Sequence, residues 1–106
     1  MPIVPSGFVN QAQLSTVIDK AIRKLGKEAV RLKYSFGADF SGEPSIFFRI
    51  VLSDAASREN VLAQVTDRIV TTLYEEIRPQ ENWGLLPYFR FRSQSEQAER
   101  KDPEWV

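Results

Sequence analysis

Apolar residues near the N-terminus recur every three or four positions, which is the spacing of a helix with one buried face. The stripe consists of Leu14, Val17, Ile18, Ala21, Ile22 and Leu25. Asn10 is a suitable N-cap and Gly26 is a suitable left-handed stop. The pattern therefore predicts a helix over residues 10–25.

Three later segments alternate apolar and polar side chains, which is typical of strands with one buried face. They cover residues 30–36, 46–52 and 85–92, and two glycines and a proline mark a loop between the first two. The alternation predicts one apolar face made of Leu32, Tyr34, Ile46, Phe48, Ile50, Phe89 and Phe91.

A second helical stripe separates the second and third strands. Its apolar positions are Leu62, Val65, Ile69, Leu73 and Ile77. Ser57 as N-cap and Pro79 as a stop predict a helix over residues 57–78, followed by a turn at 80–84. Residues 93–106 form a polar C-terminal tail, for which a short helix over 96–101 and a mobile segment are the two alternatives.

The elements occur in the order helix, strand, strand, helix, strand, which predicts an α+β fold. Two amphipathic helices and a three-stranded sheet with one apolar face fit a two-layer sandwich, with both helices on one face. We expect one α+β domain over residues 1–92 with a mostly antiparallel sheet and the third strand beside the first. Parallel pairing of the third strand with the second is the alternative.

This αββαβ order resembles the bacterial variant of the KH domain, and in particular the KH-like fold of the ribosome-binding factor A family. The chain contains no Gly-x-x-Gly sequence, with which sequence-reading KH domains clamp the nucleic-acid backbone. The segment GEPSIFFRIVL, residues 42–52, followed by a capped helix, is similar to a group of small uncharacterised bacterial α+β proteins. That resemblance implies no activity.

The composition excludes several classes of chemistry. The chain has no Cys and no His, so disulfides, structural zinc and Cys- or His-based catalysis are excluded. No serine lies in a nucleophile elbow, and no glycine-rich loop matches a phosphate-binding fingerprint. Asp39 and Glu43 are oxygen donors for a hard cation, but turn formation explains the same residues. We predict a non-enzymatic protein with no cofactor and no metal site.

Strand alternation concentrates positive charge on the outer face of the sheet, although fourteen basic residues balance fourteen acidic residues overall. The candidate binding residues are Arg31, Lys33, Phe47, Arg49, Tyr88, Arg90 and Arg92. Three interpretations are open: a solvated face, a face covered by a second copy, another protein or the acidic tail, and a platform for RNA. The apolar side chains of Phe47, Val51 and Tyr88 favour a covered face.

The sequence therefore predicts a small protein-interaction module that forms a homodimer, with an RNA-binding accessory protein as the alternative. The first nine residues lack the basic and apolar regions of a secretory signal. No segment approaches the roughly 20 apolar residues that a membrane helix needs. We expect no membrane partner and a cytoplasmic location, which the absence of Cys also favours.

Overall fold

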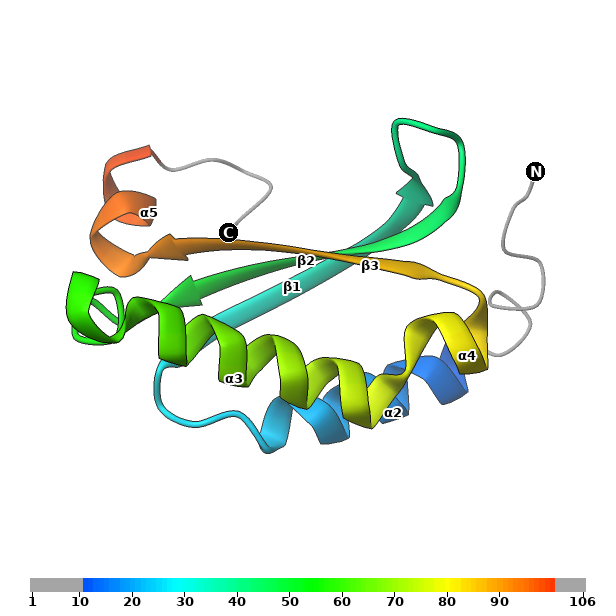
Figure 1. Cartoon of the computed structure of the whole chain (residues 1–106), viewed down its shortest axis with the longest axis horizontal. Coiled ribbons are helices and arrows are strands. Elements are labelled where there is room, and N and C mark those ends of the chain that lie inside the picture. The colour runs from blue at the N-terminus through cyan, green and yellow to red at the C-terminus, as the bar shows by residue number, and fades with distance from the viewer. Residues whose placement is uncertain (1–10, 101–106) are drawn as a thin grey trace.

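The computed structural model describes residues 11–100 and contains the predicted elements in the predicted order (Figure 1). The longer helices are α2 (Gln11–Arg23) and α3 (Glu59–Ile77), and the shorter ones are α4 (Pro79–Trp83) and α5 (Gln94–Arg100). The strands are β1 (Ala29–Ala38), β2 (Pro44–Leu52) and β3 (Leu86–Ser93). The α+β class is confirmed, whereas the predicted N-cap, Asn10, lies outside the described residues.

The three strands form a mixed sheet in the order β1-β2-β3. β1 pairs antiparallel with β2, and β3 pairs parallel with the other edge of β2. Our prediction that the third strand lies beside the first is therefore wrong, and the parallel alternative is correct. The alternation of side chains in the sequence indicates which residues share a face, and it does not determine which strands are neighbours. α3 returns the chain to the starting end of β2, which a parallel pair needs.

Helices α2 and α3 lie together on one side of the sheet, so the predicted two-layer arrangement is confirmed (Figure 1). The core between the layers is built from alternate residues of β2 and from one stripe of each helix. Its members include Leu14, Ile18, Ala21, Ile46, Phe48, Ile50, Leu52, Val65, Ile69, Leu73 and Ile77. At the surface, the Lys24 ammonium lies 2.9 Å from a Glu76 carboxylate oxygen and joins the two helices.

The helix ends differ from the sequence predictions in local detail. Arg58, not Ser57, is the N-cap of α3, because the Ser57 hydroxyl instead donates to the Ser53 carbonyl oxygen. Gly26 does not have the positive φ that we expected, and α2 closes with tight hydrogen bonds such as Leu25 N–H to the Ile22 carbonyl.

The turn predicted at 80–84 is instead the short helix α4. α3 ends before Pro79, as expected, and Arg78 takes a left-handed φ of 47° between the two helices. Pro79 occupies the first turn of α4, where its missing N–H costs nothing. Trp83, the last residue of α4, packs against the core. None of the described helices is long and apolar enough to cross a membrane.

Candidate binding face

The sheet has an outer face, defined here as the face turned away from α2 and α3, and all seven candidate residues lie on it. The strand register aligns them in rows across the three strands. One row, the cation row, consists of Lys33, Arg49 and Arg90. The neighbouring rows are Ser35, Phe47 and Tyr88 on one side, and Arg31, Val51 and Arg92 on the other.

The cation row brings three positively charged side chains side by side on neighbouring strands. Lys33 and Arg90 are exposed, and Arg31 of the next row is exposed as well. Arg49 is half-buried, and its Nη1 donates to the Ser35 hydroxyl at 3.0 Å. The middle of the outer face is therefore a cationic surface suited to an anionic partner.

The two aromatic candidates pack on each other. The rings of Phe47 and Tyr88 are stacked with centroids 5.5 Å apart and an interplanar angle of 17°. A Cβ at Gly37 would lie 3.5 Å from Cε2 of Phe47, so this ring also leans over the glycine of β1. Both aromatic side chains are half-buried. The ring faces that meet are thus occupied within the protein and are not open to a stacked base.

The loop between β1 and β2 rises above the outer face and is fixed by Asp39 (Figure 1). The Tyr88 hydroxyl donates to Asp39 Oδ2 at 2.7 Å, and Oδ1 accepts from the backbone N–H groups of Ser41 and Glu43. These bonds, that of Tyr88 first, lower the pKa of Asp39 to about 2, while the same contact raises the pKa of Tyr88. The carboxylate of Asp39 therefore holds the turn.

The loop presents Phe40, which the sequence prediction overlooked. Its side chain is 96% exposed, although it directly follows the well-anchored Asp39. The signal in the sequence was a single aromatic residue among turn-forming residues. Among the described residues, no group of three or more acidic side chains is placed to hold a metal ion.

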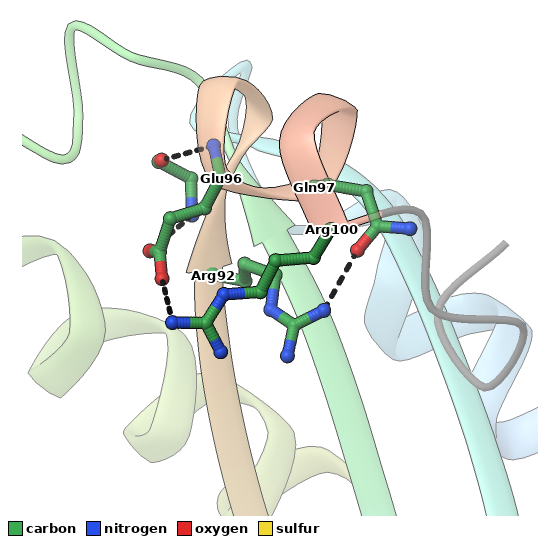
Figure 2. Close-up of polar contacts among 5 residues, drawn as sticks. Arg92, Glu96, Gln97 and Arg100 are labelled. Atoms are coloured by element: carbon green, nitrogen blue, oxygen red, sulfur yellow. Dashed lines mark hydrogen bonds and ion pairs between the residues drawn. The ribbon is translucent and has the colours of Figure 1, made fainter.

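Arg92 shares the outer face but is covered by α5, the helix that forms from part of the predicted tail. Its side chain is only 6% exposed, and its Nη1 donates to Gln97 Oε1 at 3.1 Å (Figure 2). Val51, its neighbour in the same row, is 5% exposed. α5 thus covers one end of the outer face. The rest of the cationic surface consists of the half-buried Arg49 and the exposed Arg31, Lys33 and Arg90.

Polar contacts at its first turn hold α5 in this position. The Ser93 hydroxyl accepts from Glu96 N–H at 3.1 Å, and Glu96 Oε1 accepts from Ser93 N–H at 3.3 Å, which is a capping box. Asp54 accepts from the backbone N–H and the hydroxyl of Ser95, and these bonds lower its pKa. The Ser-x-x-Glu spacing at 93–96 was the sequence signal for this helix start.

A bulge in β1 opens a groove beside α5. Ala29 pairs with Leu52 and Arg31 with Val51, so Val30 is the extra residue of the bulge. Val30 has an apolar side chain, but it is 48% exposed and lines the groove with Arg31, Val51 and Ala98. The groove has a volume of about 670 Å³ and is open to solvent.

Comparison with protein-family models, curated proteins and solved structures gives no match to this chain. The geometry of the outer face is therefore the basis of the functional argument.

Proposed function

We propose that the protein is a small non-enzymatic interaction module whose outer face binds an acidic segment of another protein. Charge supports an anionic partner, because the cation row occupies the centre of this face and Arg31 extends it. A chain without Cys needs no oxidising compartment, so we place the module in the cytoplasm.

Phe40 is the observation that favours a protein as the partner. Phe40 is almost fully exposed, and it lies on a loop that the contact between Asp39 and Tyr88 fixes. The backbone of this loop therefore loses little conformational entropy when a partner binds. Aromatic side chains presented in this way commonly supply much of the binding energy of a protein interface. The loop stands on the same side of the sheet as the cation row (Figure 1). One partner can therefore contact Phe40 and the cations together.

We also propose that the protein self-associates, and the charges on the outer face limit how two copies can pack together. Two outer faces packed together would oppose the cation row of each copy to cations of the other. Salt screens such repulsion within about 8–10 Å. Dimer formation in sedimentation velocity experiments should therefore strengthen from 50 to 500 mM salt, whereas binding of an acidic partner should weaken.

Single-stranded RNA is the second candidate ligand, since a cationic sheet bearing a tyrosine on its edge strand is a common form of RNA platform. The four exposed or half-buried cations predict a salt dependence of binding with a log–log slope of about −3. The stacking of Phe47 on Tyr88 argues against a strong platform, because each ring already uses one face.

Photo-crosslinking distinguishes the two candidates. We would replace Phe40 with benzoylphenylalanine, and use Gln64, an exposed residue of α3, as the matched control position. The proposal predicts nuclease-resistant protein adducts at position 40, absent at position 64, whose crosslinked segment is rich in acids. Arg90→Glu should abolish these adducts, and its circular dichroism spectrum checks that the fold is retained.

Nuclease-sensitive adducts at position 40 would instead support RNA. Equal adducts at both positions, or adducts that survive Arg90→Glu, would contradict the assignment of the outer face.

A further inference from the structure

The outer edge of β3 adjoins an apolar groove on the inner side of the sheet. Within residues 11–100, β3 has β2 as a strand neighbour on one side and no strand on the other. Phe89 and Phe91 point to the inner side and form one wall of the groove, while Leu62 and Val70 of α3 contribute to the other. The groove has a volume of about 840 Å³, and Leu62 is 37% exposed in it.

The length of the groove fits a short extended segment. Its lining on α3 runs from Glu59 to Val70, which corresponds to about 16 Å along a helix. An extended chain advances about 3.3 Å per residue, so a segment of about five residues would span the groove. A strand added at the edge of β3 would satisfy backbone groups there and place alternate side chains over Phe89 and Phe91.

Charge determines which side chains such a segment can carry. On the inner side, Glu59 and Asp67 border the groove and disfavour acidic side chains. On the outer side, the exposed Arg90 lies between Phe89 and Phe91 in the strand and favours acidic ones. Opposing positions on neighbouring strands have Cβ atoms about 5 Å apart, close enough for this discrimination. The added strand should therefore alternate acids on the outer side with apolar residues on the inner side.

The same charges disfavour a second copy of this chain at this edge. Pairing β3 with its own counterpart would bring Arg90 beside the cationic outer face of the other copy. It would also bring the acids of two α3 helices together at the grooves, with Glu59 and Asp67 in each copy. RNA does not fit the groove either, because these acids repel phosphate.

We propose that the protein binds an extended protein segment of alternating acidic and apolar residues as a fourth strand beside β3, with the apolar side chains in the groove between β3 and α3. This inference rests on the proposed function and specifies the form that its acidic partner takes.

The test uses the full chain and a blocked five-residue peptide of alternating glutamate and valine. Titration followed by NMR should give saturable shifts, and hydrogen exchange of amides in β3 should slow when the peptide is bound. A matched peptide of alternating lysine and valine should bind at least about tenfold more weakly. Equal or tighter binding of the lysine peptide would overturn the charge argument.

Two variants locate the site. Ala63→Glu places a charge in the groove at an exposed helix position and should weaken binding by about tenfold or more. Gln64→Glu adds the same charge about 100° further around α3 and should leave binding within about twofold. Unchanged binding to Ala63→Glu would refute the groove.

Phe40→Ser separates this inference from the proposed function. It removes the exposed ring of the loop and leaves the groove untouched. Peptide binding lost with Ala63→Glu but kept with Phe40→Ser supports strand addition. The reverse pattern would place the peptide on the outer face alone, which overturns the inference and leaves the proposed function standing.

Discussion

The docking of α5 depends on its capping box, and Ser93→Ala tests this directly. The substitution removes the hydroxyl that accepts from Glu96 N–H and leaves the strand backbone unchanged. Loss of a serine N-cap typically costs about 1 kcal/mol, with a range of about 0.5–2. α5 has seven residues and none of its own side chains is buried, so it has little packing to offset that loss. About 1 kcal/mol corresponds to about a fivefold larger population with α5 open.

Native-state hydrogen exchange followed by NMR measures this population. The amides of 96–100 should exchange about fivefold faster in Ser93→Ala, with the largest change at Glu96. We expect α5 to open before the sheet does, because none of its side chains is buried, so the urea midpoint should change little. Thr66→Ala is the control, since its hydroxyl bonds only within α3. Equal exchange at 96–100 in wild type and Ser93→Ala would refute the view that the capping box holds α5.

Three further outcomes follow from buried packing, backbone geometry and titration. Phe48→Ala removes a buried ring whose centroid lies 5.1 Å from that of the Phe89 ring, and it should lower the free energy of unfolding measured in urea by about 3–5 kcal/mol. Phe40→Ala removes an exposed ring and should change this free energy by less than about 0.5 kcal/mol. Gly84→Ala should cost about 1 kcal/mol in the same assay, because Gly84 has a φ of 67° and the space around it is open. The pKa of Asp39 is lowered in the folded state to about 2, so the stability that its carboxylate contributes is present above about pH 4 and lost as pH falls toward 2. Urea denaturation between pH 2 and 5 should show this loss for wild type and a flatter profile for Asp39→Asn.

The phase of the strands could be predicted from the sequence because alternation is a local property. Ile46, Phe48 and Ile50 alternate with Phe47 and Arg49. This alternation predicts which residues share a face without any knowledge of how the strands pair, and the register agrees with it. The placement of the seven candidate residues on one face follows from that alternation. Their role in binding stays a prediction.

Strand order could not be read from the same alternation, since each strand shows one apolar face whichever neighbours it has. Phe47 and Val51 on the outer face of β2 do not decide the order either, because apolar residues there indicate that the face is covered and not which strands lie beside β2.

Two features of the outer face were missed because they depend on residues far apart in the sequence. Arg92 becomes buried only when α5 returns over it, and α5 is held partly by Asp54, which lies 41 residues before Ser95. Val30 is exposed because a bulge at this position shifts the register of β1 against β2. Local patterns in β1 gave no sign of that shift.

The parallel pairing of β2 with β3 has a consequence for synthesis of the chain. The whole of α3 and α4 separates the two strands, so β2 pairs with β1 early and cannot pair with its second neighbour until Leu86–Ser93 have been synthesised. Before β3 has been synthesised, the apolar β2 offers an unpaired backbone edge to any other extended polypeptide. A premature stop codon before Leu86 would leave this edge of β2 permanently unpaired, and the truncated products should be insoluble.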